Sequence, residues 1–272
     1  MNDWPWWLLV AILLGLFIVL LIINNETWTN AFKFVSQGIR TTITLALVGY
    51  AIAIIVGMLI GLGRVASTDR LFGVIYYNFA TFYVEIVRGI PMLVIILYVA
   101  FVAVPMAVDG LNALGEWLLG NGLETVGTAL AEVTTRNFSN AARVAFALGI
   151  AYGAFEAEVI RAGIESVEKG QMEAARSLGM SYIQSMRYII LPQAIRSVMP
   201  ALGNDFVAMV KDSSLASVLG VQDLTQLTKL YASSTFIFFQ TWSITAFIYL
   251  VITVSLTRVV RWMERRLRRG RR

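Results

Sequence analysis

The charged side chains of this chain are carboxylates, guanidinium groups and a few lysines, since its 272 residues include neither histidine nor cysteine. The chain therefore lacks the commonest general base and metal ligand, has no thiol nucleophile and can form no disulfide. It also has no Gly-x-x-x-x-Gly-Lys-Ser/Thr sequence, so it cannot hold ATP through a P-loop. What remains is ionic recognition, in which a carboxylate meets an arginine of a partner or the ammonium group of a ligand.

One charged segment between two apolar stretches contains Glu173, Ala174, Ala175 and Arg176. Strong helix formers with an acid in the first turn predict a short helix, in which Glu173 and Arg176 share a face. Gly179 is the left-handed residue expected to end this helix. The two alanines are small, so the surface of another protein could approach the backbone closely.

A second short helix is predicted to start at Ser181, which forms a capping box with Gln184. It is expected to stop before Pro192, because the residue preceding a proline disfavours the helical conformation. Its apolar side is expected to consist of Ile183, Met186 and Ile190. Two helices joined in this way would make a rigid projection for docking, although an ordinary interfacial helix-turn-helix without a docking role fits the same pattern.

Composition places the elements that carry these residues in a bilayer. The sequence is 58% hydrophobic and 14% charged, with a mean hydropathy of +0.71, which is too apolar for a soluble domain. Six apolar stretches predict membrane spans: Trp6–Ile23, Ile39–Gly63, Leu71–Val104, Ala141–Ile160, Ile195–Val210 and Phe236–Thr257. The first stretch lacks the basic leader of a cleaved signal peptide, which favours an uncleaved span.

The stretch Leu71–Val104 is long and is interrupted by Gly89 and Pro91, so it is either one kinked crossing or two short ones. One crossing places the basic segments Arg64–Arg70 and Arg161–Arg196 and the Arg-rich C-terminus on one side. The loop Pro105–Asn140, which has four acids and one arginine, then lies on the other side, and a short amphipathic helix on the outer surface is expected within it. This partition obeys the positive-inside rule and predicts that both termini are cytoplasmic.

The positive net charge of the chain is local to its C-terminus. From Arg258 to Arg272 there are eight arginines and one acid, a net charge of +7, so the remaining residues of a chain with a net charge of +5 carry −2. A basic end of this kind suits an anchor beside anionic lipid headgroups better than a nucleic-acid partner.

Ionisable residues inside the spans are costly unless they are paired or hydrated. Glu85 and Arg88 are spaced for an ion pair with each other, and Glu158 has Arg161 three residues later. Glu156 has no partner in helical reach, so it is expected to face a cavity. We hypothesise a substrate path, called here the pathway set, that comprises Glu85, Arg88, Glu156, Glu158, Asn204, Asp205, Lys211, Asp212, Ser213 and Ser214, with Glu156 and the residues from Asn204 onward as its lining.

The segment around Glu173 resembles the coupling loop of ATP-binding-cassette (ABC) importer permeases. The resemblance rests on Glu-Ala-Ala at 173–175, on Gly179 and on Ile190-Leu191-Pro192. Stretches similar to the polar amino-acid branch of that family are Gly38–Thr42, Tyr83–Leu93, Tyr152 with Ala157–Ile164, Leu191–Arg196 and Lys211–Leu215. The resemblance covers residues 38–104 and 141–260. Ile90 and Ser213 stand where threonine is common, the loop 105–140 is longer than usual, and the first span lies outside the family core.

The resemblance implies an all-α polytopic membrane protein with a five-helix type I ABC importer permease core and one extra N-terminal transmembrane helix. The expected regions are a first helix and external linker (1–37), a permease domain (38–260) with an external loop (105–140) and a coupling loop (165–192), and a basic cytoplasmic tail (261–272). The residues it implies for docking an ATPase are Gly170, Glu173, Ala174, Ala175, Arg176, Gly179, Leu191 and Pro192.

The resemblance further implies that this chain is no enzyme and binds no cofactor, since ATP and Mg²⁺ are held by separate ATPase subunits. The other implied partners are a second permease subunit, identical or homologous, an extracytoplasmic amino-acid-binding protein, a polar amino-acid substrate and membrane lipid, with no nucleic acid. The implied location is the bacterial cytoplasmic (inner) membrane. An ion-coupled secondary transporter would need mid-membrane carboxylates and usually repeated halves, and no repeat is visible. A purely structural membrane scaffold is the other alternative.

Overall fold

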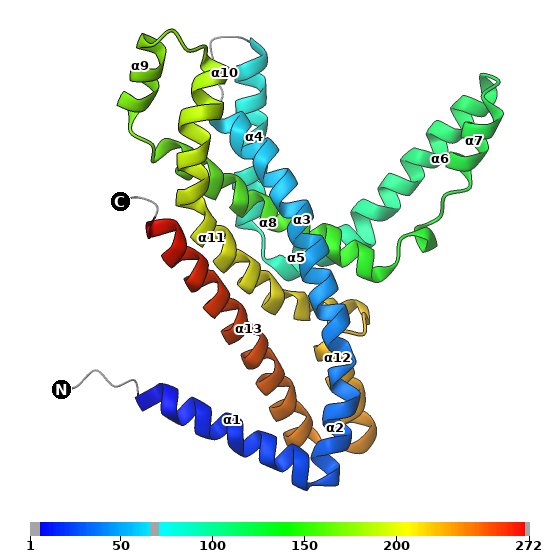
Figure 1. Cartoon of the computed structure of the whole chain (residues 1–272). Helices are drawn as coiled ribbons and strands as arrows, with labels where there is room; N and C mark the ends of the chain where they lie inside the picture. The colour runs from blue at the N-terminus through cyan, green and yellow to red at the C-terminus, as the bar shows by residue number, and fades with distance from the viewer. Residues whose placement is uncertain (1–5, 66–70, 270–272) are drawn as a thin grey trace.

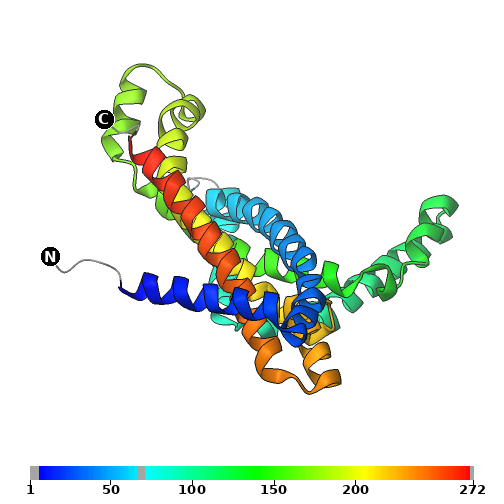
Figure 2. The same ribbon diagram turned by 60° about the horizontal axis from the view of Figure 1, so that its bottom comes forward.

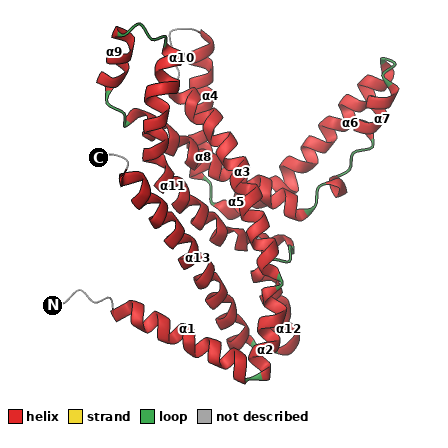
Figure 3. Cartoon of the chain, viewed as in Figure 1, coloured by secondary structure: helices red, strands yellow, loops and turns green. Residues whose placement is uncertain are grey.

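The computed structural model describes residues 6–65 and 71–269, and every regular element within them is a helix (Figures 1 and 3). Predictions that concern residues 1–5, 66–70 and 270–272, including Arg70, Arg271 and Arg272, lie outside the described residues. The α-helices are α1 (Trp6–Asn24), α2 (Glu26–Ser36), α3 (Gly38–Val65), α4 (Leu71–Gly89), α5 (Met92–Tyr98), α6 (Val104–Gly120), α7 (Glu124–Ala131), α8 (Asn140–Glu165), α9 (Lys169–Ser177), α10 (Tyr182–Ser185), α11 (Leu191–Asp212), α12 (Leu224–Thr235) and α13 (Phe238–Arg269). The π-helices are η1 (Val99–Ala103) and η3 (Met186–Ile190), and the 3₁₀-helices are η2 (Thr135–Asn137) and η4 (Ser213–Leu219).

Helices α3 and α8 pack against each other at the centre of the molecule. Each carries a small residue at every fourth position on the contact face: Gly49, Ala53, Gly57 and Gly61 on α3, and Ala145, Gly149, Gly153 and Ala157 on α8. A Cβ on Gly57 would lie 2.5 Å from the Cβ of Glu156, and one on Gly149 would lie 2.5 Å from Ile52. Small residues at this spacing let two helices approach closely, which is how helices associate in a bilayer.

Different helices make up the two ends of the molecule. Helices α9 and α10 and the start of α4 lie toward one end, whereas α2 and α12 lie at the other (Figure 1). Helix α13 starts near α12 and runs along α11, so that its basic end lies beside the middle of α11 (Figures 1 and 2). Helix α1 packs on α2 and on α13, and its first turns diverge from the body. Of the residues expected to form a linker after the first helix, Glu26–Ser36 are helical in α2.

The stretch Leu71–Val104 is broken where glycine and proline predicted a break. Helix α4 ends at Gly89, and α5 begins after Pro91. Beyond it the expected external loop with one short surface helix is wrong in form: residues 104–131 make a hairpin of two packed helices, α6 and α7, that projects away from the body (Figure 1). The reason is close packing, because a Cβ on Gly115 would lie 2.4 Å from the backbone nitrogen of Ala131.

Three prolines of the described residues lie inside continuous helix: Pro105, Pro192 and Pro200, of which the first two follow a π-turn. The prediction that the second short helix stops before Pro192 is wrong, because α10, η3 and α11 follow one another without interruption. The amide of Leu191 donates to the carbonyl of Met186 five residues earlier, and Val104, just before Pro105, donates in the same way to Val99. In both places a wide π-turn reroutes the hydrogen bonds ahead of a residue that has no N–H, so the helix continues.

Three helical stretches in the described part of the chain are long and apolar enough to cross a bilayer: Glu26–Val65, Met92–Gly120 and Phe238–Leu267. Leu9–Asn24 is apolar but shorter. Helices α8 and α11 correspond to two further predicted spans, and both carry several charged residues. The chain is thus all-α with several membrane-type helices, and the count of six crossings stays a prediction.

The start of α3 closes against the start of α12. A Cβ on Gly38 would lie 2.5 Å from the nitrogen of Leu224 and 2.7 Å from the carbonyl oxygen of Asp223. The amide of Leu224 donates to the hydroxyl of Thr42 at 3.2 Å in a fully buried contact. These contacts explain two residues of the Gly38–Thr42 stretch. Position 38 has no room for a side chain, and Thr42 supplies the hydroxyl that accepts a hydrogen bond from the amide of Leu224.

Candidate functional site

The coupling loop, residues 165–192, begins with helix α9, which ends as the sequence predicted. Gly179 has φ +80°, in the left-handed region, and its amide donates to the carbonyl of Arg176 at 2.9 Å. The amide of Met180 donates to the carbonyl of Ala175 at 3.1 Å, so two carbonyls at the helix end are satisfied. Glu173 and Ala174 are exposed, whereas Ala175 is buried. Of the two alanines, only Ala174 therefore offers a close approach to a partner.

The capping box predicted for the second helix is present. The amide of Gln184 donates to the hydroxyl of Ser181 at 3.3 Å, and the amide of Ser181 donates to the Gln184 side chain at 2.8 Å. The expected apolar side is confirmed only in part, because Ile190 is buried and Ile183 is 76% exposed. The π-turn η3 lies between these positions and changes the helical period, so residues on either side of it no longer share one face.

The loop exposes a surface that the sequence analysis did not single out. Leu178 is 83% exposed and Tyr188 is 63% exposed, and Ile183 of the same loop is exposed as well. On the opposite side Met172 and Met186 pack against the buried residues Ile164, Ile190 and Ala194. The apolar underside fixes the projection to α8 and α11, while the same loop exposes apolar side chains and the carboxylate of Glu173. Exposed apolar residues on a fixed element are suited to binding another protein.

Glu156 is fully buried between α8 and α3, and neither of its carboxylate oxygens has a hydrogen-bond partner. Tyr50 and Asp205 lie close enough to interact with it electrostatically, but the hydroxyl of Tyr50 donates to the carbonyl of Leu202 at 2.5 Å. The sequence placed Glu156 toward a cavity, and the structure places it in the helical interior. An unsatisfied buried carboxyl is costly and calls for a functional explanation.

The polar residues of α11 approach Glu156 only in part. Asn204 and Lys211 are exposed, and Asp205 and Asp212 are half-buried. The hydroxyl of Tyr152 on α8 donates to Asp212 at 2.8 Å. The buried hydroxyl of Ser213 donates to the carbonyl of Val210 at 2.8 Å, which satisfies it within its own turn, and Ser214 is half-buried.

Three acids of the pathway set, Glu156, Asp205 and Asp212, thus lie with two tyrosines among α3, α8 and α11. A cluster of carboxyls and hydroxyls can receive an ammonium group or share protons.

The remaining members of the pathway set have other partners. Among the described residues no ion pair joins Glu85 to Arg88, although their spacing allowed one, and the guanidinium of Arg88 lies 5.5 Å from the ring centroid of Phe155. Glu158 pairs with Arg161, as its spacing indicated, and also with Arg64 of α3 at 2.5 Å. Arg161 pairs in addition with Glu165. Glu158 is therefore held in an ion-pair network that ties α3 to α8.

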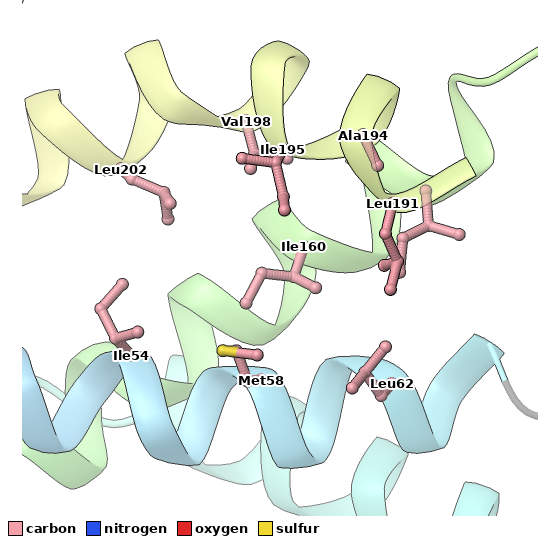
Figure 4. A pocket seen from close by; sticks show the side chains of 10 residues that line it. Ile54, Met58, Leu62, Ile160, Leu191, Ala194, Ile195, Val198 and Leu202 are labelled. Atoms are coloured by element: carbon pink, nitrogen blue, oxygen red, sulfur yellow. The ribbon is translucent and has the colours of Figure 1, made fainter. Parts of the chain in front are cut away.

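An apolar cavity of about 190 Å³ lies between α3, α8 and α11 (Figure 4). Side chains from all three helices point into it, including Met58, Ile160 and Leu191. No member of the pathway set lines this cavity, and every residue that lines it has an apolar side chain. It offers nothing to the charged groups of an amino acid, so it is not a candidate substrate site. Within residues 6–65 and 71–269, no group of three or more acids is placed to hold a metal ion.

Comparison with known proteins places this geometry in context. Residues 53–269 match the model of the family described as binding-protein-dependent transport system inner membrane component. The chain is 36% identical over 250 residues to the probable glutamine ABC transporter permease protein GlnM of Bacillus subtilis (strain 168), covering 91% of this chain and 99% of that one. It is 31% identical over 238 residues to the glutamine transport system permease protein GlnP of Escherichia coli (strain K12), covering 88% and 94%.

Solved structures agree with the sequence comparisons. The crystal structure of an amino acid ABC transporter with histidines superposes with a TM-score of 0.68 at 32% sequence identity and covers 90% of this chain and 98% of that chain. An inward-facing structure of the MetNI methionine ABC transporter superposes with a TM-score of 0.57 at 19% identity, over 86% and 95%. The second likeness concerns the fold alone.

Proposed function

Because this chain belongs to the family of binding-protein-dependent transport system inner membrane components, we infer that it is a permease subunit of an amino-acid ABC importer with the type I permease fold. The observation that carries this function is similarity over nearly the whole chain to an amino-acid transporter of known structure, at 32% identity. An ion-coupled secondary transporter is not favoured, because the relatives are permease components of ABC systems. Relatives named for glutamine support polar amino acids as the substrate class.

Separate ATPase subunits, which hold ATP and Mg²⁺, dock at the coupling loop. The exposed carboxylate of Glu173 meets an arginine of the ATPase, and the exposed Leu178 and Ile183 pack into its surface. Gly170, Ala174 and Arg176 are exposed on the same helix, Gly179 sets the angle between α9 and α10, and Leu191 and Pro192 join the loop to α11. Support for this assignment comes from the rigid underside of the loop, which can transmit motion to α8 and α11.

In the assembled importer two permease subunits, identical or homologous, form the pathway in the cytoplasmic membrane, and an extracytoplasmic binding protein delivers the amino acid. Both termini of this chain are cytoplasmic. ATP binding closes the ATPase pair, and rigid-body rocking of the helices exposes the site to alternate sides of the membrane. The chain is divided into an N-terminal helix and linker (1–37), the permease domain (38–260) and a basic tail (261–272).

Docking at the coupling loop is tested by co-purification. The wild-type chain, extracted with its native membrane partners, should bring down an ATPase subunit, and the double variant Glu173→Ala/Gly179→Pro should not. Because Gly179→Pro also perturbs the backbone, the variant Leu178→Asp tests the same surface at a residue that is 83% exposed. Glu124→Gln on the distant hairpin serves as the control. ATPase recovery that is equal for all four chains would reject the docking surface.

The substrate path is tested at Glu156. Its carboxylate meets the ammonium group of the amino acid once movement of α3 against α8 opens the contact at Gly57. Glu156→Gln should lower transport about tenfold or more while ATPase co-purification is retained, since the loop is untouched. Glu132→Gln, an exposed acid of the 105–140 region, is the control. Unchanged transport by Glu156→Gln would remove this residue from the path.

A further inference from the structure

The last helix continues well beyond the membrane and changes character abruptly. From Phe238 to Thr257 α13 is about 30 Å long at about 1.5 Å per residue, which matches the hydrocarbon core of a bilayer. Arg258 follows immediately, and Arg261 and Arg265 lie about 5 and 10 Å further along the axis. The polar headgroup layer is about 5–8 Å deep on each side, so the first arginines lie at its level.

The arginines of this end share one face. At about 100° per residue, Arg258, Arg261, Arg265 and Arg266 fall within an arc of about 140°, and Val260 lies on the opposite side. Val260 is buried against α11, where a Cβ on Gly203 would lie 2.8 Å from its Cγ1. The contact with α11 therefore fixes the rotation of α13 and turns the arginine face outward.

The outward face is strongly cationic, because residues 258–269 include six arginines and one acid, Glu264. None of the ion pairs found among residues 6–65 and 71–269 involves Arg258, Arg261 or Arg265. Like charges spaced three and four residues apart destabilise a helix, so this arrangement favours a bound anion. Trp262 lies within the same arc, is 51% exposed and has the guanidinium of Arg266 at 4.4 Å from its ring centroid. Tryptophan is typical of the headgroup level, where its ring is apolar and its N–H is hydrated.

We propose that Arg258, Arg261 and Arg265, together with Trp262, form a binding site for the phosphodiester headgroups of anionic phospholipids. Guanidinium groups bind phosphate oxygens in pairs, and the apolar segment before Arg258 puts Arg258 and Arg261 at the level of the lipid phosphates, with Arg265 at the aqueous edge of the headgroups. Because Val260 ties this end of α13 to α11, bound lipid also steadies the helix that continues from the coupling loop. The site goes beyond the transport function and requires only that α13 crosses the bilayer.

The test uses the full chain in phosphatidylcholine nanodiscs with and without about one-third phosphatidylglycerol, followed by counting of retained lipids by native mass spectrometry. Arg258→Gln/Arg261→Gln/Arg265→Gln should retain at least about threefold less phosphatidylglycerol than wild type, with unchanged phosphatidylcholine. The charge-matched control is Lys33→Gln/Arg40→Gln/Arg136→Gln, which removes three exposed cations elsewhere. Equal losses in both triple variants, or no preference for phosphatidylglycerol in wild type, would overturn the site.

Two further experiments test alternative explanations of this result. If the glutamine variant unfolds, the corresponding Arg→Lys triple variant keeps the charge and should show intermediate retention, because lysine lacks the paired donors of arginine. If the Arg→Lys variant retained as much phosphatidylglycerol as wild type, charge alone would account for lipid binding. That result would contradict a site formed by guanidinium groups. Inorganic phosphate in phosphatidylcholine nanodiscs distinguishes a lipid site from a free-anion site. A rise in thermal stability with phosphate as large as that with phosphatidylglycerol would reject the lipid assignment.

Discussion

Two glycines of the coupling loop provide a matched pair at the scale of single residues. Gly179 has φ +80° and Gly170 does not have a left-handed conformation, yet no atom lies within 4 Å of a Cβ added to either. Gly179→Ala should therefore destabilise the loop by about 1 kcal/mol through backbone strain alone. Gly170→Ala should be neutral or slightly stabilising. Thermal unfolding in detergent and ATPase recovery measure both variants, and a loss with Gly170→Ala as large as with Gly179→Ala would contradict the backbone argument.

The carboxylate of Glu158 should matter more for stability than that of its neighbour Glu165. The side chain of Arg64 is only 10% exposed, so Glu158→Gln leaves a largely buried guanidinium without its carboxylate, at a cost of about 1–3 kcal/mol. Glu165 is 52% exposed, and Glu165→Gln should cost less than about 0.5 kcal/mol. Chemical denaturation of the two variants in the same detergent compares them. Equal free energies of unfolding would show that the α3–α8 ion pair contributes nothing.

Contacts between residues of one helix were easier to predict from the sequence than contacts between helices. The pairing of Glu158 with Arg161 follows from spacing along one helix, but its second partner, Arg64, lies on another helix. Glu156 has no partner in helical reach, and that much was predicted correctly. Its burial against Gly57 depends on how α3 and α8 pack, which a charge pattern on one helix does not specify.

At the scale of elements, apolar length and glycine or proline breaks located the helices well, including the break before α5. The four-residue spacing of small residues on α3 and α8 could have indicated their contact, since such spacing is a known packing signal. The helix through Pro192 could not be foreseen from the rule that proline stops a helix. That rule assumes i to i−4 hydrogen bonds, and the wide turn η3 avoids them.

The start of α12 gives a pH-dependent prediction. Asp223, at the N-terminus of α12 and outside the predicted spans, is fully buried, and this burial raises its pKa although the amide of Gln226 donates to it at 2.8 Å. An acid whose pKa is raised in the folded state binds protons more tightly there than when unfolded. Its contribution to stability is therefore lost as pH rises from about 4 through the raised pKa.

Asp223→Asn keeps the acceptor for the Gln226 amide and removes the buried charge, because asparagine caps helices as well as aspartate does. Its melting temperature should exceed that of wild type at about pH 8, with the difference shrinking toward about pH 5. Asp223→Ala loses the cap and should be less stable than Asp223→Asn at both pH values, by about 1 kcal/mol. A difference between wild type and Asp223→Asn that does not vary with pH would show that Asp223 does not titrate in this range.

At the scale of the whole molecule, the distribution of charge predicts on which side of the membrane the coupling loop and the hairpin lie. The coupling loop lies at one end of the molecule, and the acid-rich hairpin of α6 and α7 projects sideways from the body (Figure 1). A single kinked crossing by α4 and α5 puts the hairpin on the side opposite the coupling loop. If the break at Pro91 instead separated two full crossings, the hairpin and the loop would share a side.

The absence of cysteine makes this topology directly measurable, because any introduced cysteine is the one thiol in the chain. Leu178→Cys, at the exposed end of α9, should react with a membrane-impermeant maleimide only in inside-out vesicles. Asn121→Cys, at the exposed turn between α6 and α7, should react only in right-side-out vesicles. Ala147→Cys, at a fully buried position of α8, should stay unlabelled in both and controls for leaky or unfolded preparations. Labelling of Leu178→Cys and Asn121→Cys from the same side would contradict the single kinked crossing and, with it, the cytoplasmic placement of both termini.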